Sequence, residues 1–215
     1  MSSFPLILSS PSGAGKTTIA RELLRRDTSL GYSVSWTTRL PREGEVEGRD
    51  YYFVSRAEFV EALEGSRFAE FADVHGEMYG TLRSEVDRLL DAGRHVVMDI
   101  DVQGARQFVA SYPQSVLVFV LPPDAGVLLG RLRERGTENK KSLSRRLRSA
   151  VGELHAIEMY QYVIVNDDLE RAVIAVSGIV RAEGARIVRL EDLATRVSAI
   201  VAGLESELAD INRSN

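Results

Sequence analysis

The sequence of 215 residues contains no cysteine, one tryptophan and six prolines. The lack of cysteine excludes disulfide bonds and thiolate metal sites. No stretch comes near the roughly 20 consecutive apolar residues that a helix needs to span a bilayer. The net charge is only −4, so the composition gives no reason to expect nucleic acid or a membrane as partner. Met1–Leu8 lacks the basic start and the longer apolar run of a signal peptide, and we therefore expect a cytoplasmic protein.

The overall composition, with 44% hydrophobic and 27% charged residues, is typical of a soluble globular protein. Short, continuously apolar runs predict buried strands at Phe4–Ser9, His95–Ile100, Val116–Leu121 and Tyr162–Val165. Each run leads into a helical pattern, the first of which is Lys16–Arg26. Strands that are covered on both faces require continuous apolarity, so we expect an α/β protein with a parallel core sheet between layers of helices.

Residues 35–81 depart from this alternation. They contain strand-like pieces at Tyr51–Val54 and Phe68–Val74 around one helix. The start of that helix has a capping box formed by Ser55 and Glu58. We therefore expect a mixed α/β subdomain that is inserted into the core.

Two further segments are distinct from the core pattern. Residues 124–155 are rich in arginine and lysine, which predicts a basic helical segment. Residues 191–211 carry apolar side chains at helical spacing. This spacing predicts a C-terminal helix that packs on the core or on a partner.

A phosphate-binding loop follows the first predicted strand. Residues 10–17 read SPSGAGKT, which is the Walker A pattern with Ser10 in place of the first glycine. Glycines let backbone N–H groups turn toward phosphates, the following helix contributes its dipole, and Lys16 supplies a cation. The Thr17 hydroxyl is suited to bind Mg²⁺. Serine can replace the glycine if its φ stays negative. By itself the loop fits GTPases, motors, transport ATPases and small-molecule kinases.

Further motifs narrow this choice. Residues 33–45 read SVSWTTRLPREGE, and they are followed by GRDYYF at 48–53, FAEF at 68–71, YGT at 79–81, DIDVQG at 99–104, RGTE at 135–138 and VNDD at 165–168. In this order and spacing, from about Leu6 to about Glu183, the motifs resemble those of guanylate kinases, a family of P-loop nucleoside monophosphate kinases. The resemblance covers most of the chain and is far more specific than the loop alone.

The residue types in these motifs suit a nucleotide acceptor. Arg39 and Arg42 can bind phosphate with bidentate guanidinium groups. Guanine offers two N–H donors beside the O6 acceptor, which a carboxylate and a hydroxyl can recognise. The resemblance implies that GMP is held by Ser35, Arg39, Arg42, Tyr51, Glu70, Tyr79, Thr81, Asp99 and Asp101. Taken singly, these residues also fit solvated loop charges, an exposed strand carboxylate and a small core.

Asp99 and Asp101 follow an apolar strand at the end where open α/β sheets bind ligands. Alternation along the extended chain turns both side chains to one face. We name Thr17 and Asp99 as the expected metal-binding residues, with Asp101 as the alternative carboxylate. Asp101 is also suited to cap the helix that begins at Val102.

The resemblance also implies the ATP site and the catalytic residues. The residues expected at ATP are Ser12, Gly13, Ala14, Gly15, Lys16, Thr17, Thr18 and Asn166. The catalytic residues are expected to be Lys16 together with the arginines of the basic segment that match the family, Arg131, Arg135 and Arg146. Positioned arginines stabilise the negative charge that spreads over the γ-phosphoryl oxygens during transfer.

We therefore expect one domain with a P-loop NTPase fold of three α/β/α layers. Its core comprises residues 1–34, 82–123 and 156–190, its GMP-binding insert residues 35–81 and its helical lid residues 124–155. A C-terminal helix within 191–215 follows. The expected reaction transfers the γ-phosphoryl group of ATP to GMP, and to dGMP, with Mg²⁺, in purine nucleotide metabolism.

Two alternatives stay open at this point. A catalytically inactive protein-binding module of the same fold is disfavoured because the phosphate loop keeps Lys16. A kinase for another small phosphorylated acceptor is disfavoured by the set Ser35, Glu70 and Thr81. The chain is expected to be a monomer or a homodimer, and its small-molecule substrates ATP and GMP are its expected partners.

Overall fold

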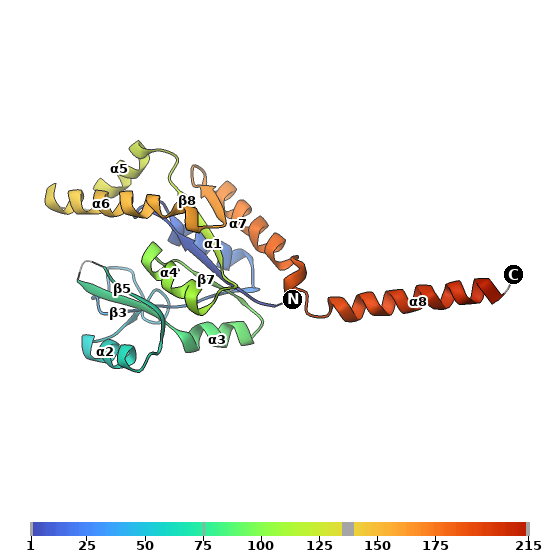
Figure 1. Cartoon of the computed structure of the whole chain (residues 1–215). Helices are drawn as coiled ribbons and strands as arrows, with labels where there is room; N and C mark the ends of the chain where they lie inside the picture. Colours follow the sequence, from blue (N-terminus) through green and yellow to red (C-terminus); the bar gives the residue numbers. More distant parts are fainter. Residues whose placement is uncertain (1, 75, 135–139, 214–215) are drawn as a thin grey trace.

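The computed structural model describes residues 2–74, 76–134 and 140–213, which form a layered domain and a projecting helix (Figure 1). The strands are β1 (Pro5–Ser9), β2 (Leu30–Tyr32), β3 (Trp36–Thr37), β4 (Tyr52–Phe53), β5 (Phe68–Val74), β6 (Glu77–Leu82), β7 (His95–Met98), β8 (Val116–Leu121) and β9 (Tyr162–Val165). The helices are α1 (Lys16–Arg26), α2 (Arg56–Glu64), α3 (Arg83–Asp91), α4 (Val102–Ser111), α5 (Ala125–Glu134), α6 (Lys140–His155), α7 (Leu169–Gly184) and α8 (Leu193–Arg213), with 3₁₀ turns η1 (Ile157–Met159) and η2 (Ile187–Arg189).

The core sheet has the strand order β2-β7-β1-β8-β9, and all of its neighbouring strands are parallel. Leu6 and Leu8 of β1 pack on one face with α1 and α7. Ile7 packs on the other face with α3 and α4. Val118 and Phe119 of β8 divide between the two faces in the same way. The expected α/β fold with a parallel core sheet is confirmed, and burial of both faces explains the continuous apolar runs.

The carboxyl ends of the core strands lie at one edge of the sheet, and the expected site residues follow them. The glycine-rich loop follows β1, Asp99 follows β7 and Asn166 follows β9. The backbone N–H of Asn166 donates to the carbonyl of Leu121 at 2.8 Å, which fixes the start of this last loop beside β8. This edge is where open α/β sheets bind their ligands.

The insert contains a second sheet of order β4-β3-β6-β5. β3 pairs with β4 in parallel and with β6 in antiparallel orientation. The insert combines this sheet with the helix α2, which gives the mixed α/β composition expected from the sequence. Phe59, Phe68 and the partly buried Trp36 form a small core between this sheet and α2. The capping box is confirmed, because the Ser55 hydroxyl accepts from the Glu58 N–H at 3.2 Å while the Glu58 carboxylate accepts from the Ser55 N–H at 2.8 Å.

Strand β5 joins the insert to the core. The Gln107 side chain of α4 accepts from the Phe71 N–H at 3.1 Å and donates to the Phe71 carbonyl at 2.8 Å, as a neighbouring strand would do. Ala69 of β5 is buried with the core residues of α4. A second link is the ion pair between Arg21 of α1 and Asp50, with a nitrogen–oxygen distance of 2.5 Å.

Helices α5 and α6 pack on each other through Leu128, Leu132 and Ala150. In Figure 1 this pair and the insert extend on the same side of the core sheet. The phosphate loop and Asp99 lie at the carboxyl ends of the core strands. The insert and the α5–α6 pair both begin at this same end of the sheet.

Helix α8 projects away from the domain at the end opposite to the insert (Figure 1). None of its residues is buried. Of the two predicted arrangements, packing on the chain's own core is therefore wrong. No helix within the described part of the chain is long and apolar enough to cross a membrane.

Candidate active site

The loop between β1 and α1 has the geometry that phosphate binding requires. Gly13 and Gly15 have φ values of 91° and 96°, in the left-handed region that glycine adopts without strain. Ser66 is the only non-glycine residue with positive φ among the described residues, so Ser10 keeps a negative φ and its replacement of the first glycine costs no strain. The N–H of Ser12 already points at an anion, the Glu153 carboxylate of α6, at 3.4 Å.

Two side chains from other elements hold this loop in shape. The Asn166 amide donates to the carbonyl of Ala14 at 2.7 Å. The Arg131 guanidinium of α5 donates to the carbonyl of Gly13 at 3.3 Å. Between them lies a cleft of about 320 Å³, lined by Gly13, Gly15, Thr18, Arg131, Asn166, Asp167 and Leu169.

Asp99 connects the phosphate loop to the core sheet. One of its carboxylate oxygens accepts from the Thr17 hydroxyl and the other from the Tyr32 hydroxyl, each at 2.5 Å. Burial and the nearby Asp99 charge raise the pKa of Tyr32 well above its usual value, so this phenol stays protonated and donates. The expected pair Thr17 and Asp99 is thus brought together, and Tyr32 fixes the orientation of the carboxylate.

A second cluster lies where β5 and β6 of the insert meet α4. Glu70 is buried, with 4% of its surface exposed, which excludes the alternative of an exposed strand carboxylate. Its Oε1 accepts from the Thr81 hydroxyl at 2.6 Å, and the Thr81 and Ser35 hydroxyls lie 3.0 Å apart. Burial, together with the negative charge of Asp101, raises the pKa of Glu70 to about 7. One carboxylate and two hydroxyls are therefore assembled in one place.

The first turn of α4 completes this cluster. The Asp101 carboxylate accepts from the Gly104 N–H at 2.7 Å, so the capping arrangement suggested by the sequence is present. A Cβ on Gly104 would lie only 2.5 Å from Oε2 of Glu70. Real Cβ atoms do not approach an oxygen this closely, so the absence of a side chain at Gly104 gives Glu70 its position.

A cationic cluster is formed by the loop between β3 and β4 together with Tyr79 of β6. The Arg39 guanidinium makes two bonds of 2.9 Å to the Glu45 carboxylate and donates to the Tyr79 hydroxyl at 3.1 Å. The Tyr51 ring contacts the Tyr79 ring edge-on at 5.8 Å and lies 5.3 Å from the Arg39 guanidinium carbon. Arg42 is exposed, and its backbone N–H donates to Glu45 at 2.7 Å. A bidentate fork of this kind is the geometry that binds phosphate as well as carboxylate.

The expected lid arginines are placed in part. Arg131 reaches the phosphate loop, as described above, and Arg146 lies half-buried on α6. Arg135 lies outside the described residues. Glu153, on the same helix as Arg146, approaches the phosphate loop. Burial raises the pKa of its carboxyl above the usual value, although the positive charge of Lys16 acts in the opposite direction.

Several residues in these clusters were not singled out from the sequence. Tyr32 and Glu153 act through contacts with residues far away in the chain, which no local pattern signals. Glu45, Gly104 and Asp167 lie inside the motifs SVSWTTRLPREGE, DIDVQG and VNDD, and their presence there was the available signal.

The fold and these clusters together define a class of protein. A phosphate loop at the carboxyl edge of a parallel sheet lies beside an insert that carries its own cationic cluster and a buried carboxylate. This is the arrangement of a P-loop kinase that takes a small phosphorylated acceptor.

Comparison with known proteins identifies the family. The family model for guanylate kinase matches residues 2–183. The guanylate kinase of Clostridium tetani is 42% identical over 187 residues, which covers 87% of this chain and 89% of the relative. That of Nitratidesulfovibrio vulgaris is 50% identical over 168 residues, covering 78% and 81%. The crystal structure of guanylate kinase from Anaplasma phagocytophilum matches with a TM-score of 0.76 at 35% identity, covering 92% of this chain and 94% of that one.

The chain therefore belongs to the guanylate kinase family. It is an ATP:GMP phosphotransferase, that is, a nucleoside monophosphate kinase with ATP as co-substrate.

The close approach of Gly104 to Glu70 gives a first prediction. Gly104→Ala should raise the KM for GMP at least tenfold, because the new methyl group displaces the Glu70 carboxylate. The KM for ATP should stay within about twofold, since the phosphate loop is untouched. Helix stability should not fall, because alanine has the higher helix propensity by about 1 kcal/mol.

Steady-state kinetics with each substrate varied in turn, together with urea unfolding, would check this. Gly126→Ala on α5 is the matched control, because its Cβ would meet only the Asp124 carboxylate at 3.1 Å. An unchanged KM for GMP in Gly104→Ala would show that Glu70 is not held by this contact.

Proposed function

We propose that the two clusters divide the reaction between them, with ATP on the phosphate loop and GMP on the insert. Ser12, Gly13, Ala14, Gly15, Lys16 and Thr17 hold the phosphates of ATP. Its nucleoside occupies the cleft beside the loop, in contact with Thr18 and Asn166. The volume of about 320 Å³ and the position of this cleft at the loop support the assignment.

GMP is held at two points on the insert. Its phosphate binds the guanidinium groups of Arg39 and Arg42 and the hydroxyls of Tyr51 and Tyr79. Glu45 keeps Arg39 in its forked orientation, as the two 2.9 Å bonds suggest. The guanine base is read by Ser35, Glu70 and Thr81, with Asp101 beside them at the nucleoside.

The buried Glu70 carboxylate carries this proposal. A buried carboxylate is costly unless hydrogen-bond donors compensate its charge, and ligand donors can add to the bond from Thr81. The N1–H and N2–H groups of guanine are such donors, and adenine lacks this pair. A site that leaves a buried polar group unpaired rejects the wrong base strongly, by a factor of roughly 10⁴ or more in the best-built cases.

The donor set at Thr17 and Asp99 fits Mg²⁺. This ion prefers oxygen ligands and usually combines one or two carboxylates with substrate phosphates. The described residues include no group of three or more histidine, cysteine, aspartate or glutamate side chains that would form a metal cage by themselves, which suits such a shared site. When bound, Mg²⁺ would neutralise charge on the phosphate oxygens, and Tyr32 would keep Asp99 aligned.

Lys16 and Arg131 stabilise the charge on the transferred group, together with Arg135 and Arg146 on the lid. The phosphate of GMP attacks the γ-phosphorus in line, and the enzyme contributes positioning and electrostatic stabilisation. The 3.3 Å contact from Arg131 to the loop supports its place beside the phosphates. Closure of α5 and α6 over the site would exclude water and prevent hydrolysis of ATP.

A release assay for ADP with GMP, dGMP, AMP, CMP and UMP tests base recognition. The wild-type chain should use GMP best and dGMP next. Glu70→Gln should raise the KM for GMP about 10- to 150-fold, because a hydrogen bond to a charged group contributes about 1.5–3 kcal/mol. Asp73→Asn, a carboxylate-to-amide change at an exposed position of the same strand, is the control and should behave as wild type. Equal use of AMP and GMP by the wild type would refute the assignment.

The raised pKa of Glu70 predicts how the GMP affinity depends on pH. Only the ionised carboxylate accepts both guanine N–H groups, and the free enzyme loses it as the pH falls through about 7. The dissociation constant for GMP should therefore be constant above about pH 8 and rise about tenfold per pH unit below 7. Calorimetric titration from pH 5.5 to 9 measures it.

The GMP phosphate itself titrates near pH 6, so a control is needed. Glu70→Gln keeps the phosphate and removes the carboxylate. Its profile should be flat between pH 7 and 8, where that of the wild type already bends. Parallel profiles for the two proteins would count against a titrating Glu70.

Loss of the loop lysine tests the donor half of the site. Lys16→Ala should lower kcat at least about 100-fold, the scale seen when one positioned donor to a developing charge is removed. The melting temperature should change little. Arg25→Ala on the exposed side of the same helix is the control and should keep full activity. Normal turnover in Lys16→Ala would remove the lysine from the mechanism.

A further inference from the structure

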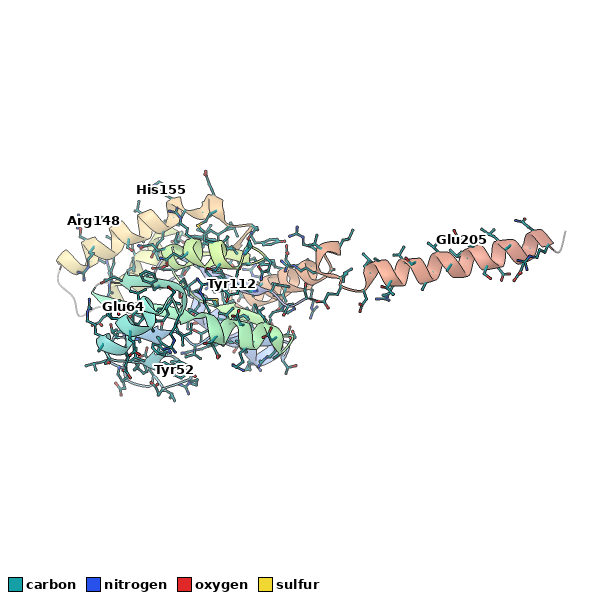
Figure 2. All side chains as sticks on the ribbon, turned by 60° about the horizontal axis from the view of Figure 1, so that its bottom comes forward. Tyr52, Glu64, Tyr112, Arg148, His155 and Glu205 are labelled. Carbon is teal, nitrogen blue, oxygen red and sulfur yellow. The ribbon has the colours of Figure 1, made fainter. Side chains whose placement is uncertain are left out.

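Helix α8 carries an exposed apolar stripe that the rest of the chain does not cover. Val197, Ile200, Val201, Leu204, Leu208 and Ile211 each keep between 45% and 63% of their surface exposed. The helix stands apart from the domain in both Figure 1 and Figure 2, where Glu205 marks its position. The match to the family model ends at residue 183, so α8 lies beyond the part that defines the kinase.

The stripe has the spacing of a coiled coil. Its seam residues alternate in steps of three and four along the helix, and they are Ala194, Val197, Val201, Leu204, Leu208 and Ile211. A helix that packs on a flat protein surface shows a broader apolar face, whereas this narrow pattern with a seven-residue repeat is typical of two helices that wind around each other. Ile200 widens the seam on one side.

An isolated helix of 21 residues is only marginally stable in water, and a stripe of exposed aliphatic side chains adds no stability to it. Its helical form is explained if a partner covers the seam. No residue of α8 is buried by its own chain, so the partner is another molecule.

We propose that this partner is α8 of a second copy of the chain, and that the two helices pair in antiparallel orientation. Residues i and j then face each other when their numbers add up to 405. Val201 meets Leu204 of the second copy, Val197 meets Leu208, and Ala194 meets Ile211. A single self-complementary seam is the simplest two-fold interface, since both copies contribute the same residues.

The distribution of charge decides the orientation. Glu205, Glu207 and Asp210 lie in the second half of α8, where Arg213 is the one basic side chain and pairs with Asp210 at 3.6 Å, whereas Arg196 lies in the first half. Acidic groups near the C-terminus of a helix interact unfavourably with the dipole of that helix. In an antiparallel pair these groups also lie beside the N-terminus of the other helix, where its dipole attracts them. Arg196 then comes within reach of Glu207 of the second copy, twice per dimer. A parallel pair would place the acidic halves side by side.

Association is tested first. The full chain should sediment with twice its mass of 23.8 kDa at high concentration and return to 23.8 kDa on dilution. Leu204→Glu should sediment as a monomer throughout, because it places a charge in the centre of the seam. Ser206→Glu puts the same charge on the outer face and should behave as wild type. Both variants should keep the kinase activity, since α8 lies apart from the site.

The lack of cysteine in the chain allows a direct test of orientation. Val197→Cys and Leu208→Cys are prepared separately, mixed and exposed to a mild oxidant. Each thiol faces the other position in the antiparallel pair, so the mixture should form disulfide-linked dimers and neither variant alone should do so.

Three results would overturn the proposal. Linked dimers of either variant alone would indicate a parallel pair. A monomeric wild-type chain at all concentrations would exclude a second copy as the partner. A dimer that persists unchanged in Leu204→Glu would place the interface elsewhere on the molecule.

Discussion

The contact between Glu70 of β5 and the first turn of α4 fixes the geometry of the proposed acceptor site. β5 can approach α4 so closely because Gly104 has no side chain and because Gln107 pairs with the backbone of Phe71 one residue beyond Glu70. The same approach buries Ala69 in the main core. The insert is therefore anchored through the strand that carries Glu70, the carboxylate that we propose recognises the base. Any displacement of this strand changes the position of Glu70 and the packing of the core together.

Burial of that carboxylate has an energetic cost, which the raised pKa near 7 expresses. The Thr81 hydroxyl offsets part of the cost with its 2.6 Å bond. A ligand that donates two further hydrogen bonds to Glu70 offsets more of the cost of burial. A ligand without these donors leaves that cost uncompensated. The binding energy of the base is thus linked to the protonation of one group in the free enzyme. Asp99 differs from Glu70, because it is only partly buried and both of its oxygens already accept hydrogen bonds, from Thr17 and Tyr32.

The sequence predicted the features that depend on neighbouring residues. The strands at Val116–Leu121 and Tyr162–Val165, the capping box at Ser55 and the helix that begins at Val102 all appear where they were expected. The predicted strand His95–Ile100 ends at Met98, and the next residues enter the ligand edge. Each of these features is encoded by side chains that lie within a few positions of one another.

Features that depend on distant partners could not be predicted in this way. The strand β3 has only two residues, Trp36 and Thr37, and it exists because β6 and β4 flank it. The clash distance at Gly104 and the bond from Tyr32 to Asp99 join residues more than 30 positions apart. The motif resemblance named most residues of the candidate site, and the local pattern suggested the Asp101 cap of α4, but neither could say that the charge of Asp101 raises the pKa of Glu70.

The position of α8 separates association from catalysis. The helix leaves the domain at the end opposite to the insert and to helices α5 and α6 (Figure 1). Helix α8 has 21 residues and is about 31.5 Å long at 1.5 Å per residue, and its seam pairs the two chains at these tails. The closure of α5 and α6 that we propose then needs no rearrangement of the interface, because neither the insert nor these helices contribute to the seam. Two copies joined in this way act as independent kinases, and their pairing affects the stability of α8 rather than the chemistry at Asp99.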